Sequence, residues 1–284
     1  MKVLVFGRRG QVARALMVAG PEMGVQITAL GRDQADLSDP ATCAAAIAAS
    51  DAEAVINAAA WTAVDAAEDQ EAAARVINGD APAAMAQACA TTAVPFVQIS
   101  TDYVFDGRGT APWAPDAQTG PLGAYGRTKL AGEEGVIAAG GVYAILRTAW
   151  VFDGDGQNFV TTMLRLSETR NALRVVSDQV GGPTPAQAIA EACLVIAKAL
   201  AAGQQASGTY HFSGAPEVSW ADFARAIFAT AGRDVTVTDI PSAAYPNLAA
   251  RPANSRLDCR STQEIFGVGR PDWQAALAKV VVRS

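Results

Sequence analysis

The sequence predicts an α/β fold in which a parallel sheet is covered by helices on both faces and is followed by a smaller C-terminal lobe. Over the first half of the chain, short β-branched runs alternate with alanine-rich helical runs. A glycine-containing turn joins the first of these runs to the first helix. Beyond Trp150 the alternation loosens, and proline and glycine become frequent. Alternating strands and helices build parallel sheets, so the first half is expected to form the sheet.

The elements of the first half follow from local patterns. Apolar, mostly β-branched runs predict strands, and they span residues 3–6, 25–30, 54–57, 94–100 and 142–147. Alanine-rich runs predict the intervening helices, over residues 11–19, 40–49, 81–92 and 122–138. Asp39 can cap the second helix, because its side chain can accept a backbone N–H and Pro40 suits the first helical position.

The later half contains three further helical patterns. They cover residues 158–168, 185–202 and 219–231, and Ser219 is a candidate cap for the last. We expect residues 151–284 to form mainly the smaller lobe, with a segment near 185–202 returning to the sheet domain of residues 1–150. Residues 208–212 form a strand-like run that contains the only histidine, His211. A packed histidine is the expected role there.

Composition excludes several classes of protein. The chain has 284 residues, of which 50% are hydrophobic and 18% charged, as in globular proteins. A formal net charge of −6 argues against broad binding to nucleic acid or anionic membranes. The N-terminal apolar run is too short for a signal peptide, and no stretch approaches a membrane span, so a cytoplasmic location is expected. The four dispersed cysteines predict buried thiols rather than a zinc site or disulfides.

The turn after the first strand has the pattern G-x-x-G-x-x-A, with Gly7, Gly10 and Ala13 at the defined positions. Glycines allow a tight turn and close approach of a pyrophosphate, while the helix N-terminus supplies N–H groups. An ordinary strand–turn–helix connection is the alternative. The position of the turn, directly between the first strand and the first helix, favours a Rossmann-type, doubly wound dinucleotide-binding sheet.

Cofactor choice depends on the end of the second strand. A cation there suits the 2′-phosphate of NADP, whereas an acidic residue suits the ribose of NAD. The chain has Arg32 followed by Asp33, with Arg8 and Arg9 in the glycine turn. Arg32 favours NADPH, and Asp33 keeps NADH open.

Three residues form a candidate catalytic group. Tyr125 and Lys129 are four apart on a predicted helix and therefore share one face. A nearby ammonium is expected to lower the pKa of the tyrosine, which is ordinarily about 10. Thr101 follows a predicted strand, at the sheet edge where parallel α/β proteins bind ligands. Tyr-x-x-x-Lys alone arises often by chance, but its order and spacing with the glycine turn and Thr101 predict an oxidoreductase site.

With these motifs the chain resembles the extended short-chain dehydrogenases/reductases and, within them, the dTDP-4-dehydrorhamnose reductase family. The resemblance extends over nearly the whole chain. It rests on residues 6–12, 57–65, 100–105, 125–133, 147–151, 178–184 and 251–257. Members of the family often have histidine at the position that is Trp61 in this chain.

The resemblance implies reduction of the C4 keto group of dTDP-4-dehydro-L-rhamnose, a nucleotide-linked deoxysugar, with Tyr125 as proton donor and Lys129 supporting it. Thr101 would bond the sugar oxygen and tune proton transfer, and Thr101, Asp102 and Trp150 match substrate positions. The family's cofactor-binding positions are matched in this chain by Gly10, Gln11, Val12, Asp36, Leu37, Ala60, Trp61 and Thr62. The other candidate cofactor-binding residues are Gly7, Arg32, Tyr125 and Lys129. Family members can use Mg²⁺, although no ligand cluster in this sequence identifies a metal site.

Two other functions remain as alternatives. The regulatory subunit of methionine adenosyltransferase resembles the same family and binds NADP without turnover. A nucleotide-sugar epimerase or dehydratase would retain NAD tightly. Retention of Thr101, Tyr125 and Lys129 favours an enzyme, and Arg32 favours a reductase. The sequence leaves a homodimer open.

Overall fold

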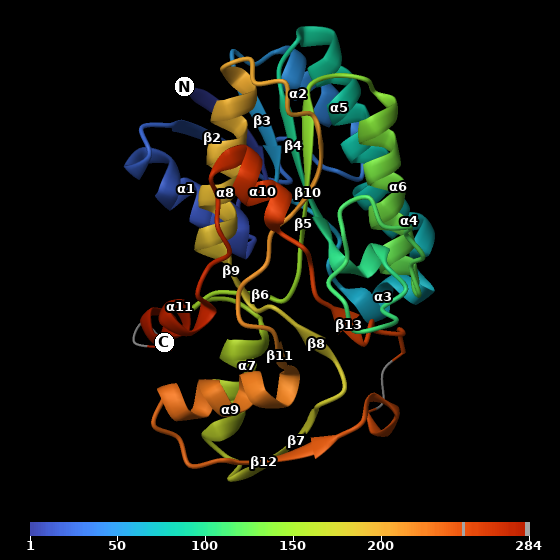
Figure 1. Cartoon of the computed structure of the whole chain (residues 1–284). Helices are drawn as coiled ribbons and strands as arrows, with labels where there is room; N and C mark the ends of the chain where they lie inside the picture. The colour runs from blue at the N-terminus through green and yellow to red at the C-terminus, as the bar shows by residue number, and fades with distance from the viewer. Residues whose placement is uncertain (246–247, 282–284) are drawn as a thin grey trace.

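The computed structural model describes residues 1–245 and 248–281, and its centre is a six-stranded parallel sheet (Figure 1). The strand order is β10-β5-β4-β3-β1-β2. The order in which successive strands are added to the sheet therefore reverses between β1 and β3. This topological switch point is where such folds bind ligands. The strands are β1 (Lys2–Phe6), β2 (Gln26–Leu30), β3 (Ala54–Asn57), β4 (Phe96–Thr101), β5 (Tyr143–Thr148) and β10 (Gly208–His211).

Helices cover both faces of this sheet (Figure 1). On one face, α1 (Gln11–Glu22) and α8 (Ala186–Ala201) share a buried apolar core with β1, β3, β4 and β5. On the other, α2 (Pro40–Ala48), α5 (Ala81–Thr92) and α6 (Ala124–Ala138) form a second core. Central strands buried on both faces explain why their sequences are nearly continuous apolar runs. The α/β, Rossmann-type fold expected from the sequence is confirmed.

Each predicted element of the first half is present close to its expected bounds. The strand at 54–57 and the helix at 81–92 coincide with β3 and α5, and the others differ by a few residues at their ends. Asp39 caps α2 by accepting from the backbone N–H of Ala41. Between β3 and α5, the chain forms α3 (Val64–Asp69), α4 (Glu71–Arg75) and a π-helical turn η1 (Val76–Asp80). The sequence predicted no bounds for these three elements.

The smaller lobe surrounds its own apolar core, with Phe223 and Trp273 fully buried in it. Its helices are α7 (Phe159–Ser167), α9 (Trp220–Thr230) and α11 (Trp273–Val281), the first two as expected from the sequence. Ser219 caps α9 by accepting from the N–H of Asp222. Short strands complete the lobe: β6 (Val151–Phe152), β7 (Ala172–Val176), β8 (Val180–Gly181), β9 (Thr184–Pro185), β11 (Val218–Ser219), β12 (Thr236–Ile240) and β13 (Asn254–Ser255).

Segments beyond residue 150 also belong to the sheet. Helix α8 packs on α1 across one face, and β10 pairs with β5 as the outer strand. Helix α10 (Arg260–Phe266) lies beside β10, where Thr262 donates to the carbonyl of His211 at 2.6 Å. The chain thus leaves the sheet after β5, builds part of the lobe, and returns before completing the lobe.

All four cysteines are free and buried, as the sequence predicted. Burial raises the pKa of the Cys43 thiol to about 11, so it is inert as a thiolate near neutral pH. In the described ranges, none of the helices is long and apolar enough to cross a membrane.

Candidate active site

The turn between β1 and α1 lies against the loop that follows β3. Gly7 has φ of +115°, a conformation that L side chains rarely adopt, and a Cβ there would lie 3.2 Å from the Ala58 carbonyl group. Gly10 precedes α1 in extended conformation. The two glycines therefore keep open a backbone-lined cradle at the switch point, at the N-terminus of a helix.

The first turn of α1 fits a dinucleotide. Within the described residues, Gln11 Oε1 is buried without a hydrogen-bond partner, which marks an unsatisfied polar group at the cradle. Val12 is buried in the core beneath it, and Ala13 is fully buried, so the small residue allows α1 to pack closely on the sheet. An open glycine cradle at a helix N-terminus is what a pyrophosphate site requires, whereas the Gln11 oxygen is an acceptor and suits a hydroxyl or N–H donor.

The end of β2 carries the charges that were expected to select the cofactor. The Arg32 side chain is 78% exposed, and its Nε lies 3.6 Å from Asp36 Oδ2. Bonds from the N–H and hydroxyl of Ser38 hold the pKa of Asp36 below its usual range. Leu37 is buried in the second core. Arg32 is therefore available to a 2′-phosphate, although Asp36 partly offsets its charge.

The loop after β3 is held through its backbone. Asn78, on η1, accepts from the N–H of Trp61 at 2.8 Å and donates to the Trp61 carbonyl at 3.1 Å. The Trp61 indole donates to the Ala63 carbonyl at 3.0 Å. Ala60 is partly buried and Thr62 is exposed. Asn78 therefore fixes the main chain of this loop independently of the side chain at position 61. Sequence reasoning missed Asn78.

Thr101, Tyr125 and Lys129 come together at the carboxyl edge of the sheet. Thr101 ends β4, and Tyr125 lies in the first turn of α6, close enough for the Thr101 hydroxyl to lower the pKa of the phenol. One helical turn later, Lys129 Nζ donates to the Ile99 carbonyl of β4 at 2.8 Å. Gly126 makes this close packing possible, because a Cβ there would lie 2.2 Å from the Tyr103 carbonyl oxygen.

The pKa of Tyr125 differs from the sequence-based expectation. Burial raises the pKa of Tyr125 to about 12; the negative charge of Asp102 adds to the rise, and the Thr101 hydroxyl opposes it. Burial lowers the pKa of Lys129 to about 8, against the attraction of Glu133. The expected lowering of the Tyr125 pKa by Lys129 is therefore wrong for this structure, because desolvation of the phenolate dominates.

A buried ion pair holds α6 against the sheet. Arg147 of β5 pairs with Glu133 of α6 at 2.6 Å, and Ser100 of β4 donates to the same carboxylate at 2.5 Å. Glu133 lies one helical turn beyond Lys129, so this contact fixes the rotation of the helix that carries the candidate catalytic residues Tyr125 and Lys129. This three-residue contact was not predicted, because Arg147, Glu133 and Ser100 lie on three separate elements.

Asp102 lies beside the candidate catalytic group but is enclosed by protein. It is 2% exposed, and its two oxygens accept from Thr101 at 3.2 Å and from Ser255 at 2.5 Å. Burial raises its pKa to about 6. Ser255 comes from β13 in the smaller lobe, so one carboxylate bridges the two parts of the molecule.

Trp150 stands where the chain leaves the sheet. It adopts φ of +50°, and its ring stacks on Trp220 with centroids 3.6 Å apart. Gln179 accepts from the Trp220 indole at 3.2 Å. A Cβ at Gly181 would lie 2.9 Å from Trp150 Cε2, so the glycine makes room for the ring. Sequence reasoning missed Trp220.

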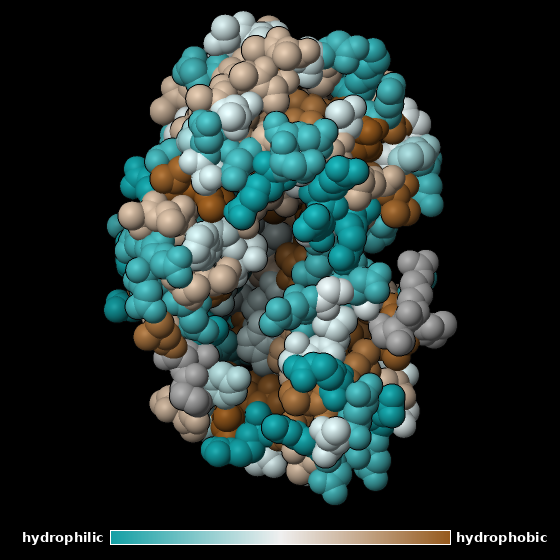
Figure 2. All heavy atoms as spheres, turned by 180° about the vertical axis from the view of Figure 1, so that it is seen from behind, coloured by the Kyte–Doolittle hydropathy of each residue, from teal (hydrophilic) through white to brown (hydrophobic). Residues whose placement is uncertain are grey.

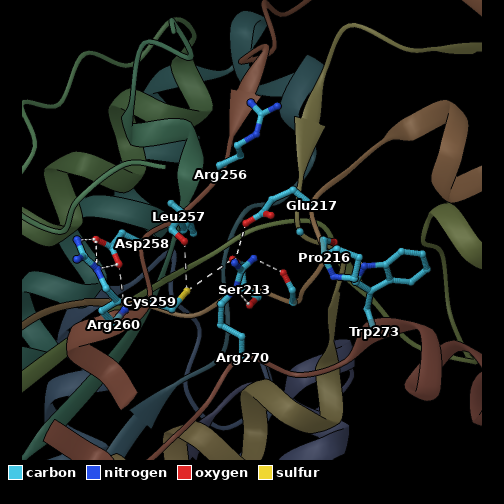
Figure 3. Close-up of polar contacts among 12 residues, drawn as sticks. Ser213, Pro216, Glu217, Arg256, Leu257, Asp258, Cys259, Arg260, Arg270 and Trp273 are labelled. Atoms are coloured by element: carbon cyan, nitrogen blue, oxygen red, sulfur yellow. Dashed lines mark hydrogen bonds and ion pairs between the residues drawn. The ribbon is translucent and has the colours of Figure 1, made fainter. Parts of the chain in front are cut away.

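Figure 2 shows the surface hollowed between the sheet domain and the smaller lobe. A separate hollow of about 300 Å³ is lined by Pro112, Leu257, Asp258, Cys259, Arg260, Gln263 and Arg270. Its charges are engaged within the protein: Arg270 pairs with Glu217 at 2.6 Å and Arg260 with Asp258 at 2.6 Å (Figure 3). No group of three or more His, Cys, Asp or Glu side chains in residues 1–245 and 248–281 could hold a metal ion.

The glycine cradle at the switch point, and the phenol, ammonium and hydroxyl at the same sheet edge, define a class: the extended short-chain dehydrogenases/reductases. The sequence model of one family, described as RmlD substrate binding domain, matches residues 1–284. The chain belongs to this family.

Known proteins match this chain over nearly its full length. A curated relative from Sinorhizobium fredii, named dTDP-4-dehydrorhamnose reductase, is 42% identical over 288 residues, covering 99% of this chain and 97% of the relative. A crystal structure of a dTDP-4-dehydrorhamnose reductase from Clostridium acetobutylicum is 36% identical, with a TM-score of 0.92 and 99% of both chains covered. The crystal structure of dTDP-4-dehydrorhamnose reductase from Bacillus anthracis in complex with NADP is 30% identical, with a TM-score of 0.91. The match covers 100% of this chain and 99% of the Bacillus anthracis chain.

Proposed function

We propose that this protein is an NADPH-dependent oxidoreductase that reduces the C4 keto group of dTDP-4-dehydro-L-rhamnose to give dTDP-L-rhamnose. The observation that carries the proposal is the placement of Thr101 and Tyr125 at the carboxyl edge of the sheet, with Lys129 one turn along the same helix as Tyr125. The full-length similarity to enzymes named dTDP-4-dehydrorhamnose reductase supports the substrate.

Residues of the first half would hold the cofactor. Gly7, Gly10, Gln11 and Val12 form the cradle for its pyrophosphate, and the first-turn N–H groups of α1 stabilise the negative charge. The exposed Arg32 would meet the 2′-phosphate, which supports NADPH over NADH, as does the NADP bound to the Bacillus anthracis relative. Asp36, Leu37 and residues 60–62 would line the adenosine and nicotinamide sides.

The chain's own groups supply proton transfer and orientation. When bound, NADPH supplies the hydride to the C4 carbonyl carbon. Tyr125 gives its phenolic proton to the C4 oxygen as negative charge develops there. Its high pKa keeps the phenol protonated near neutral pH, so the proton is present when needed. Lys129 becomes ammonium below its pKa of about 8 and would orient the cofactor from the same face of α6.

The smaller lobe would bind the sugar nucleotide. Residues 1–150, with the returning segment 185–202, would serve the cofactor, and residues 151–284 mainly the substrate. The stacked Trp150 and Trp220 present aromatic surface next to the point where the chain leaves the sheet. Such surface suits the apolar face of a deoxysugar ring. Thr101, Asp102 and Trp150 would thus surround the substrate, Asp102 acting from behind Thr101.

The test is NADPH oxidation with dTDP-4-dehydro-L-rhamnose, measured for the wild type and for Tyr125→Phe. We expect the variant to lose about 10²–10⁴-fold in kcat, the typical contribution of a general acid, while NADPH binding stays nearly unchanged. Tyr143→Phe removes a hydroxyl from a partly buried tyrosine at the start of β5, at the opposite edge of the sheet, and should turn over like the wild type.

Three results would contradict the proposal. Wild-type kcat in Tyr125→Phe would mean another proton donor. NADP binding without turnover by the wild type would favour a regulatory subunit. A protein that carries tightly bound NAD⁺ and interconverts sugar nucleotides without net NADPH oxidation would favour an epimerase.

A further inference from the structure

The helix α6, which carries Tyr125 and Lys129, has no side-chain cap of its own. Its N-cap residue is Gly123, in extended conformation, which has no side chain to offer to the first turn. Ala124, the first residue of the helix, is fully buried. Because the first N–H groups of a helix have no partner within it, a buried first turn needs an acceptor from another part of the chain.

Glu68 of α3 supplies this acceptor. Helix α3 lies beside the N-terminal end of α6 (Figure 1), and Glu68 Oε1 accepts from the Ala124 N–H at 2.9 Å across 56 positions of sequence. The partial positive charge at a helix N-terminus also favours a carboxylate at this place. Tyr125 follows Ala124 directly, so the bond holds α6 at the residue next to the candidate proton donor.

Gly123 leaves the room that the Glu68 carboxylate occupies. A Cβ at position 123 would lie too close to Glu68 Oε1 for any real contact. The φ of Gly123 is −132°, which other residues adopt readily, so glycine is needed at this position for space rather than for its backbone conformation. The missing side chain and the incoming carboxylate are therefore two parts of one fit between α3 and α6.

Helix α3 also touches the other parts of the candidate site. It begins two residues after the loop of residues 60–62, which is proposed to meet the cofactor. Asp65 lies three residues before Glu68, and residues at this spacing are neighbours on a helix. The Asp65 carboxylate accepts from the Ala249 N–H at 3.0 Å and pairs with Arg251 at 3.0 Å. One carboxylate of α3 thus holds the segment from the smaller lobe, and the other holds α6.

We propose, on the basis of the function proposed above, that Glu68 is a positioning residue that fixes the start of α6 and thereby the place of the Tyr125 phenol. It acts as an acceptor for the Ala124 N–H, and the effect reaches the phenol through the helix backbone rather than through the charge of the carboxylate. A displacement of about 1 Å at a reacting group can cost 10²-fold in rate, so a cap next to the proton donor matters for turnover.

The first experiment measures NADPH oxidation with dTDP-4-dehydro-L-rhamnose for Glu68→Ala, Glu68→Gln and a control, Glu71→Gln. Glu71 pairs with the side chain of Arg127 on the same helix at 2.7 Å, so the control removes a carboxylate from α6 without touching the helix cap. We expect Glu68→Ala to lower kcat by about 10–100-fold, with KM for NADPH within about twofold.

The two other variants separate the acceptor from its charge. Glu68→Gln keeps an oxygen that can accept the Ala124 N–H and loses the charge, so its kcat should stay within about threefold of the wild type. Glu71→Gln should turn over like the wild type. An equal loss of kcat in Glu68→Gln and Glu68→Ala would assign the effect to charge, and wild-type kcat in Glu68→Ala would remove any effect; either result overturns the inference.

Gly123→Ala tests the same contact from the side of α6, and it serves also if Glu68→Ala does not fold. The added methyl group should displace the Glu68 carboxylate and lower kcat to a similar extent. In the double variant Glu68→Ala/Gly123→Ala the second change should cost little more, because the contact is already lost. Independent, additive losses from the two changes would mean that they do not act through one contact.

The amide of Ala124 gives a readout that does not depend on turnover. Its hydrogen exchange, followed by NMR, should be slow in the wild type and in Glu68→Gln and about tenfold faster in Glu68→Ala, as expected for the loss of one hydrogen bond. Equal exchange in the wild type and Glu68→Ala would overturn the inference. If the wild type does not turn over the sugar nucleotide, the proposed function fails, and the exchange rates still decide whether Glu68 holds α6.

Discussion

At the scale of single residues, His211 shows how a conspicuous side chain can be purely structural. It is fully buried, with Nδ1 3.0 Å from the Trp113 carbonyl oxygen and Nε2 3.4 Å from Arg147 Nη1. This arrangement requires a neutral ring that donates from Nδ1 and accepts at Nε2. The packed role that the sequence predicted is confirmed.

His211 should make the protein sensitive to acid. Burial and the nearby Arg147 charge lower its pKa to about 3, whereas an unfolded histidine titrates near 6.5. Between these values the unfolded chain binds more protons, so stability falls as the pH falls. Between pH 6.5 and 5 the histidine should cost roughly 2 kcal/mol in the free energy of unfolding.

Urea unfolding at pH 8, 6.5 and 5 measures this dependence against His211→Asn. The variant should begin less stable at pH 8, because the ring contacts are lost, and should lose less stability on acidification. Equal pH slopes for the two proteins would show that His211 does not carry the effect.

Whether a residue of the candidate site could be predicted from the sequence depends on how far along the chain its partner lies. Tyr125 and Lys129 were predictable because four residues fix two side chains on one helical face. Ser255 and Trp220 were not, because their partners Asp102 and Trp150 are brought close only by the tertiary fold. The pKa of Tyr125 was mispredicted for a related reason: pairing is suggested by sequence spacing, whereas desolvation depends on packing.

At the scale of elements, the short strand β8 is defined by contacts rather than by its own pattern. Gly181 on this strand lies beneath the Trp150 ring, which stacks in turn on Trp220. Two-residue strands such as β8 and β13 have no periodicity to recognise, which is why the sequence predicted the long helices and central strands but not these.

Replacing Gly181 with alanine should disturb both neighbours of β8. The added methyl group would lie within 3.0 Å of Trp150 and of Ser255, so the indole must tilt off Trp220. We expect altered tryptophan fluorescence, a loss of about 1–3 kcal/mol in stability and a raised KM for the sugar nucleotide. Gly269→Ala is the matched control, since a Cβ there meets nothing within 4 Å. Unchanged fluorescence and KM in Gly181→Ala would contradict the role of the glycine.

At the scale of the whole molecule, the sheet domain is not a continuous stretch of chain. Its outer strand β10 and the covering helix α8 both follow residue 150. The fold class was predictable because five strands and four helices of the first half follow one alternation. The strand that completes the sheet was not assigned, because a four-residue run carries no signal for which partner it will join.

We expect residues 1–150 expressed alone not to fold. Without α8, buried apolar side chains of β1, β3, β4 and β5 would face water, and β5 would present an unpaired edge. The fragment should aggregate or show no cooperative thermal transition by circular dichroism, whereas the full chain should melt cooperatively. A soluble fragment with a sharp transition would contradict this.

The late arrival of β10 also bears on synthesis in the cell. Translation adds only about 5–20 residues each second, so an emerging chain must wait several seconds between completing β5 and delivering the strand that pairs with it. During that interval α7 of the smaller lobe is synthesised, and β5 remains an unpaired edge strand to which other polypeptides can bind. Chaperones that shield hydrophobic segments at the ribosome exit would thus meet this protein at a defined stage of elongation.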